Sequence, residues 1–186
     1  MVIPTQKECY TILNKYKVPI HIIRHSKTVS RVAIFIAKRA NLMGEDIDLL
    51  LLEASCLLHD ITKMQSLKTG EDHAKTGGKL VKSLGYPEVA AIIEEHIILK
   101  NPFRNGALTE SEILNYSDKR VKHDKIVTLK QRFEDLKIRY GDRIGRSRDE
   151  TIKRMLQLEK SSIRLEKRIF NILKISPDDL ISLNEE

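Results

Sequence analysis

The segment that most constrains the fold is residues 47–58, IDLLLLEASCLL. Drawn as a helix it is apolar on almost every side, because Asp48 and Glu53 are its only charged residues. A helix without a polar face must be covered all round by other elements, so we expect it at the centre of the domain. It is too short and too charged to span a bilayer. It ends at an adjacent pair, His59-Asp60.

The rest of the chain shows helical periodicity and no convincing strand alternation, which predicts an all-α fold. Thr5 with Glu8, and Thr109 with Glu112, have the spacing of helix-starting capping boxes. We expect helices over residues 5–18, 20–41, 46–58, 72–85, 87–98, 109–140 and 149–173, with loops at 64–71 and 101–107 and a break at 141–145. We divide the chain into a compact helical domain, residues 1–125, and a basic helical extension, residues 126–186, packed on the domain or on a partner.

The positive charge is unevenly distributed. Residues 1–118 contain 15 Lys and Arg against 14 Asp and Glu, whereas residues 119–176 contain 18 against 8. Such a segment could attract nucleic acid, an anionic nucleotide or an acidic surface, and the simpler alternative is a solvated helical face. Two cysteines without framework spacing and an N-terminus without an apolar leader favour a cytoplasmic protein with no membrane contact.

Several residues with metal-binding side chains fall on faces that should be buried. His25 shares a helical face with apolar residues, His59 and Asp60 end the central helix, and His96 and Asp118 lie on the inward sides of two further helices. A buried imidazole or carboxylate is costly unless it has a partner. Any one of them alone could be a hydrogen-bonded core residue, but together they favour a divalent metal site.

The order and spacing of these residues resemble the H…HD…D signature of the HD superfamily of metal-dependent phosphohydrolases. The matching positions are His25, His59-Asp60 and Asp118, in the strings LLHDITK (57–63) and NYSDKRV (115–121). A second pair, His123-Asp124, has no apolar flank and sits in the charged tail. We interpret that pair as a surface feature outside the metal site.

Two further histidines, His73 and His96, make the order similar to the two-metal branch of that superfamily, which includes bacterial dinucleoside tetraphosphate hydrolases and, more distantly, cyclic-dinucleotide phosphodiesterases. The downstream GYP tripeptide and the paired histidines of the latter are missing. The resemblance implies that Asp60 bridges two ions. It implies one ion on His25, His59, Asp60 and Asp118 and a second on Asp60, His73 and His96. Fe, Mn, Co, Ni and Zn all suit such ligands, and Mg suits them less.

Two cations close to the signature are candidates for binding substrate phosphate. Lys63 follows Asp60 by three residues, and Arg120 follows Asp118 by two. We expect Asp60 to orient the nucleophile and Lys63 to neutralise developing charge, although either cation could simply face solvent. The small residues Gly77 and Gly78 could let a substrate or a facing helix come close.

We therefore expect hydrolysis of a phosphate ester or anhydride, with a nucleotide, a dinucleotide or another phosphorylated small molecule as substrate. One alternative is a nucleic-acid phosphodiesterase or RNA-associated HD protein that uses the basic helices. Another is a regulatory HD module that binds metal and hydrolyses nothing. Apolar residues repeated along residues 149–173 could also form a homodimer contact.

Overall fold

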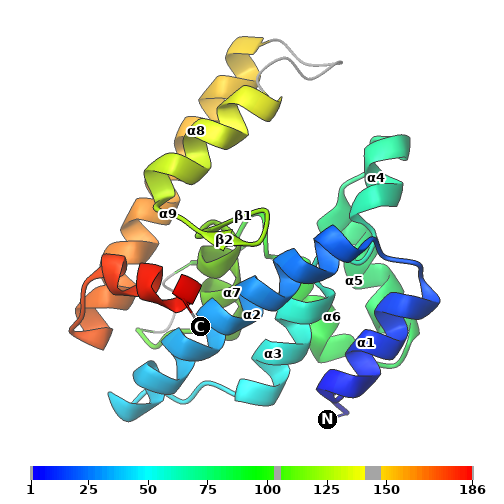
Figure 1. Cartoon of the computed structure of the whole chain (residues 1–186), viewed down its shortest axis with the longest axis horizontal. Coiled ribbons are helices and arrows are strands. Elements are labelled where there is room, and N and C mark those ends of the chain that lie inside the picture. The colour runs from blue at the N-terminus through cyan, green and yellow to red at the C-terminus, as the bar shows by residue number, and fades with distance from the viewer. Residues whose placement is uncertain (1, 103–105, 141–147, 186) are drawn as a thin grey trace.

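The structure of the chain is a computed structural model that describes residues 2–102, 106–140 and 148–185 (Figure 1). The described part is helical apart from one short hairpin, which confirms the all-α prediction. The α-helices are α1 (Gln6–Lys15), α2 (Ile20–Leu42), α3 (Leu49–Leu58), α4 (Lys63–Thr69), α5 (His73–Ser83), α6 (Pro87–Ile93), α7 (Glu110–Asp118), α8 (Leu129–Tyr140) and α9 (Arg148–Leu173). The hairpin pairs β1 (Val121–Lys122) with β2 (Lys125–Ile126), and a 3-10 helix, η1 (Pro177–Glu185), follows α9.

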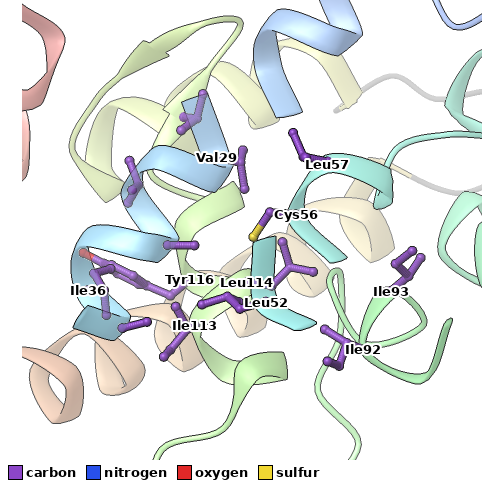
Figure 2. Packing of buried hydrophobic residues seen from close by; sticks show 14 of the residues in the cluster. Val29, Ile36, Leu52, Cys56, Leu57, Ile92, Ile93, Ile113, Leu114 and Tyr116 are labelled. Atoms are coloured by element: carbon purple, nitrogen blue, oxygen red, sulfur yellow. The ribbon is translucent and has the colours of Figure 1, made fainter. Parts of the chain in front are cut away.

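The central position predicted for residues 47–58 is confirmed by α3. Asp48 caps its start, accepting hydrogen bonds from the backbone N–H groups of Leu50 and Leu51. Its side chains pack between α2, α6 and α7 in the hydrophobic core that Figure 2 shows. The labelled core residues are Val29, Ile36, Leu52, Cys56, Leu57, Ile92, Ile93, Ile113, Leu114 and Tyr116. No helix in the described ranges is long and apolar enough to cross a membrane.

The helix predicted over residues 109–140 is wrong. The capping box at Thr109 does start α7, but α7 ends at Asp118, and the antiparallel β1–β2 hairpin separates it from α8. His123 at the hairpin turn has a φ of 58°, a left-handed conformation that a continuous helix cannot contain. Val121 and Ile126 are buried because the hairpin packs on α2, so their apolar side chains looked like a continued helical face.

Two other segments differ from the prediction, and two predicted breaks lie partly or wholly outside the described residues. The loop expected at 64–71 contains α4, which ends at Gly70 with a φ of 77°. The helix expected over 87–98 ends at Ile93, so His96 lies in the turn that follows it. Residues 103–105 of the loop at 101–107, and the break at 141–145, lie outside the described residues.

The helices α8 and α9 form a hairpin that extends away from the rest of the molecule (Figure 1). The C-terminal half of α9 returns to the body, where Leu165, Ile169 and Phe170 join the same hydrophobic core as α2 and α7. Leu180 of η1 is buried there too. The boundary at residue 125 stays a prediction, but the helices beyond it contribute side chains to the common core.

Candidate metal centre

Five separate elements bring all six predicted metal ligands together. His25 comes from the middle of α2, the pair His59-Asp60 follows the last turn of α3, and His73 begins α5. The remaining two lie in the turn after α6 and at the end of α7. Two groups have ligand atoms that all lie within 4.8 Å of one another: a first group of His25, His59 and Asp60, and a second group of Asp60, His73 and His96.

The carboxylate of Asp60 belongs to both groups and is almost completely buried. Its Oδ2 atom lies 3.4 Å from His59 Nε2 and 3.8 Å from His25 Nε2. Its Oδ1 atom lies 3.3 Å from His73 Nε2 and 3.8 Å from His96 Nε2. Each oxygen of one carboxylate therefore faces a different pair of imidazoles.

Asp118 stands beside the first group. Its Oδ1 atom lies 3.0 Å from His25 Nε2 and 3.7 Å from His59 Nε2. The side chain of Asp118 is 15% exposed, whereas that of His59 is fully buried. The first group is therefore closed to solvent at His59, beside α3, and partly open at Asp118.

Backbone carbonyls fix the orientation of three histidine rings. The Nδ1 atoms of His25, His59 and His96 lie 2.6, 2.7 and 2.7 Å from the carbonyl oxygens of His123, Cys56 and Ile93. A carbonyl oxygen only accepts hydrogen bonds, so in each ring Nδ1 carries the proton and donates. In a neutral ring, Nε2 then presents its lone pair to the cluster, which is how histidine ligates a metal ion.

The polar atoms of the cluster fit a divalent cation. His59 Nε2 and Asp60 Oδ1 are buried and have no hydrogen-bond partner within the part of the chain that the structure describes. His96 Nε2 lies only 3.2 Å from His73 Nε2, so two imidazole nitrogens converge. Buried polar groups are normally satisfied, and imidazole nitrogens that converge with carboxylates on one point are the ligands of a transition metal.

Burial and charge shift the pKa values of His59 and His96 in opposite directions. Burial works to lower the pKa of His59, but the negative charges of Asp60 and Asp118 outweigh it and raise that pKa to about 10. Burial lowers the pKa of His96 to about 3, and the positive charge of His59 adds to this effect. Burial also opposes ionisation of Asp60, yet the positive charges of Lys63 and His59 hold its pKa well below the usual range.

The structure brings one of the two predicted phosphate-binding cations to the cluster. Lys63 Nζ lies 2.6 Å from Asp60 Oδ2, and the Lys63 side chain is 25% exposed, so it reaches the site from the solvent side. Arg120 is placed differently. Its guanidinium is buried and donates to Tyr116 Oη, Glu166 Oε2 and the carbonyl of Pro177, so the structure directs it toward α9 and η1.

The sequence reasoning missed the residues that hold the ligands in place. The side chains of His123 and Asp124 are exposed, as expected. The pair does have apolar flanks, however, because Val121 and Ile126 on either side of it are buried. The His123 carbonyl orients His25, and the Asp124 carbonyl accepts from Thr28 Oγ1. No sequence pattern reveals such backbone contacts.

A second missed contact holds the turn that carries His96. The buried ammonium of Lys119 donates to the carbonyls of His96 and Ile97 and to both oxygens of Asn115. The Asn115 amide also donates to the carbonyl of His96. The i, i+4 spacing of Asn115 and Lys119 was visible in the sequence, but their partner was not.

Comparison with known families agrees with this geometry. The family described as HD domain matches residues 22–170, a range that contains all six clustered ligands. The chain belongs to the HD domain family. Membership confirms the resemblance inferred from the H…HD…D signature, and the buried His/Asp cluster is consistent with the metal-binding site of an HD domain.

Two curated relatives of this HD domain chain carry the same name. The tRNA (cytidine(56)-2'-O)-methyltransferase of Thermoplasma volcanium is 35% identical over 97 residues, which cover 52% of this chain and 27% of that protein. The tRNA (cytidine(56)-2'-O)-methyltransferase of Picrophilus torridus is 29% identical over 142 residues, covering 69% of this chain and 40% of that protein. The chain thus spans less than half the length of either relative, and no solved structure gave a significant match.

Proposed function

We propose that this HD domain is a metal-dependent phosphohydrolase with two divalent ions. His25, His59, Asp60 and Asp118 would hold one ion, and Asp60, His73 and His96 would hold the other. The observation that carries the proposal is the division of Asp60 between two histidine pairs, with Oδ2 toward the first group and Oδ1 toward the second. A carboxylate with this arrangement of neighbours is suited to bridge two cations.

The ions would supply an electrophile that activates water and clamps the phosphate oxygens during in-line displacement at phosphorus. The chain's own residues have separate tasks. Asp60 orients the nucleophile, because its two oxygens lie between the ligand groups. Lys63, which contacts Asp60 from the partly exposed side, neutralises negative charge that develops on the phosphate.

The donor set limits which metals fit. The cluster offers imidazole nitrogens and carboxylate oxygens, and both cysteines lie outside it. This mixture suits Fe, Mn, Co, Ni or Zn. Mg²⁺ is a poorer fit, because it prefers oxygen ligands and retains several waters.

For the substrate we propose a phosphate ester or anhydride of a nucleotide or dinucleotide. A two-metal centre with an adjacent lysine suits phosphate groups in general, and the phosphohydrolases that share this ligand order act on such compounds. A second candidate is a phosphodiester in RNA. The names of the two curated relatives, both tRNA methyltransferases, favour that candidate.

Substitution of the shared carboxylate tests the proposal. We expect Asp60→Ala to lose both bound metal and hydrolysis, because each ligand group loses a member. Asp124→Ala is the matched control, since it removes an exposed aspartate from the chain's other His-Asp pair. Elemental analysis after loading with each metal measures occupancy, and a screen of bis(p-nitrophenyl) phosphate, nucleotides, dinucleoside polyphosphates, cyclic dinucleotides and RNA measures activity.

The outcomes separate the alternatives. Hydrolysis by Asp60→Ala at the wild-type rate would overturn the assignment of the site. A wild-type chain that binds metal and hydrolyses none of these compounds would instead be a regulatory HD module. Cleavage of RNA alone would favour the second substrate class over nucleotides.

A further inference from the structure

The outward face of α9 carries a row of cations. The exposed residues follow the three- and four-residue spacing of a single helical face. We call this face the cationic ridge. It consists of Lys153, Gln157, Lys160, Arg164, Lys167 and Asn171, with Arg154 on its flank.

The acidic residues of α9 do not neutralise the middle of the ridge. Glu159 faces α8, where its carboxylate lies 2.7 Å from Lys137 Nζ. Glu166 faces the body of the molecule and accepts from Tyr116 and Arg120. Asp149 and Glu150 lie in the first turn, where they neighbour only Lys153 and Arg154 at the start of the ridge.

Three cations in the middle of the ridge lack acidic partners. None of Lys160, Arg164 and Lys167 has an ion-pair partner among the residues that the structure describes. All three are exposed to solvent. The excess of Lys and Arg over Asp and Glu in residues 119–176, 18 against 8, is therefore partly concentrated on one face of α9.

The dimensions and position of the ridge suit an extended polyanion. At 1.5 Å per residue, residues 153–171 span roughly 27 Å, enough for several consecutive phosphates of a duplex, in which each strand carries one phosphate per roughly 3.4 Å of helix axis. The ridge begins on the α8–α9 hairpin, which projects from the body (Figure 1), and continues along the C-terminal half of α9, whose opposite face packs on the body.

The chemistry of the ridge indicates which polyanion fits. It contains no aromatic side chain, whereas sites for single-stranded nucleic acid usually stack bases on aromatic rings. Gln157 and Asn171 lie on either side of the three central cations and can hydrogen-bond to hydroxyl groups, and A-form RNA displays its 2′-hydroxyls along a wide, shallow groove. We infer that the cationic ridge of α9 binds base-paired RNA through its phosphates and 2′-hydroxyls.

A matched pair of triple variants tests this inference in the full chain. Lys160→Gln, Arg164→Gln and Lys167→Gln together remove three ridge cations. Lys75→Gln, Lys79→Gln and Lys82→Gln remove three exposed cations with the same four-three spacing from α5. Fluorescence anisotropy with a labelled RNA duplex of about 20 base pairs, at salt between about 50 and 200 mM, measures the dissociation constant and its salt dependence.

We expect the ridge variant to weaken RNA binding at least about tenfold. The steepness of log affinity against log salt should fall by about 2 to 3, because binding without three cations releases about three fewer counterions from the RNA. The α5 variant should stay within about threefold of the wild type. EDTA in the buffer keeps the measurement independent of the metal centre, so the result is separate from the proposed hydrolysis. Circular dichroism melts establish that both variants are folded.

Several results would overturn the inference. They are equal losses from the two triple variants, no binding by the wild type at low salt, or tighter binding of single-stranded RNA than of the duplex. If a DNA duplex of the same sequence binds as tightly as the RNA duplex, the 2′-hydroxyls have no role in binding. Displacement of the duplex by polyglutamate at equal charge would instead identify the ridge as a docking face for an acidic protein.

Discussion

At the scale of single residues, Asp60 connects two sets of imidazoles that the chain supplies from distant positions. His59 and His25 face one of its oxygens, and His73 and His96 face the other. The four rings differ in exposure, because His73 is 25% exposed and the other three are nearly buried. The second group is therefore the more accessible to solvent. Substitution of His73 removes a ligand from this group without changing the first group.

Replacement of His73 tests the proposal that the chain holds two ions. We expect His73→Ala to bind one ion per chain where the wild type binds two, because the first group keeps all of its members. Elemental analysis of metal-loaded, desalted protein measures the ratio. His21→Ala removes an exposed histidine one helical turn from His25 and should keep both ions. An unchanged ratio in His73→Ala would exclude His73 as a ligand.

Metal affinity should depend on pH through His59. The pKa of His59 is raised to about 10 in the folded, metal-free chain, so its proton stabilises that state fully below about pH 6.5. This stabilisation is lost as the pH rises through about 10. Because a ligating imidazole must be deprotonated, affinity should rise by up to about tenfold per pH unit between roughly pH 7 and 9.

Calorimetry of metal binding in buffers with different ionisation enthalpies measures the proton directly. We expect an apparent binding enthalpy that varies from buffer to buffer, with about one proton released from His59 near neutral pH. A binding enthalpy that is the same in every buffer would show that no proton leaves, and hence that His59 is not protonated before the metal binds.

At the scale of elements, the close packing of α5 on α6 holds the second ligand group together. A Cβ atom added to Gly78 would lie 2.5 Å from Glu94 Cγ and 3.1 Å from the Ala90 carbonyl oxygen. A Cβ added to the neighbouring Gly77 would lie no closer than 3.4 Å to any atom. The close approach of a facing helix, which the small residues suggested, is thus confirmed at Gly78.

These two glycines provide a matched comparison. Both substitutions to alanine gain the same helix propensity, but only Gly78→Ala forces α6 and the Glu94 side chain to move. We expect Gly78→Ala to be less stable than Gly77→Ala by roughly 1–3 kcal/mol, measured by urea denaturation. It should also lower occupancy of the second ion. Equal stabilities would mean that the α5–α6 contact adjusts without cost.

At the scale of the whole molecule, buried polar contacts fasten α9 to the body. Tyr116 on α7 and Arg120 in the turn that follows α7 both donate to Glu166 Oε2. On the same side of the molecule Arg168 Nη1 lies 2.7 Å from Glu112 Oε1. In the described ranges the C-terminal half of α9 therefore packs on the helices that carry His25 and Asp118, and the family match also extends to residue 170.

Removal of Glu166 should show how much this attachment contributes to the free energy of unfolding. Glu166→Ala leaves the buried guanidinium of Arg120 without its carboxylate, so we expect a loss of about 2–4 kcal/mol. The control is Glu159→Ala, whose more exposed pair with Lys137 should contribute about 0–1 kcal/mol. Chemical denaturation measures both. Comparable losses from the two variants would contradict a structural role for Arg120 at this interface.

Much of the metal centre was readable from residue types and spacing. The all-apolar segment at residues 47–58 placed His59 and Asp60 at the end of a buried helix, because a helix with no polar face has to lie inside. The capping boxes located the starts of α1 and α7, since those hydrogen bonds are local. The six candidate ligands followed from their positions on apolar faces and from the family resemblance.

Only the tertiary structure decided which distant residues hold those ligands and which cation lies beside them. The His123 carbonyl contacts His25 from 98 residues away, and the Lys119 ammonium donates to the carbonyls of His96 and Ile97 from 23 and 22 residues away. Lys63 and Arg120 were both candidates because each follows a signature aspartate, Lys63 being the stronger. Packing directed Lys63 to Asp60 and Arg120 to Glu166, because a side chain's environment depends on the elements that fold against it.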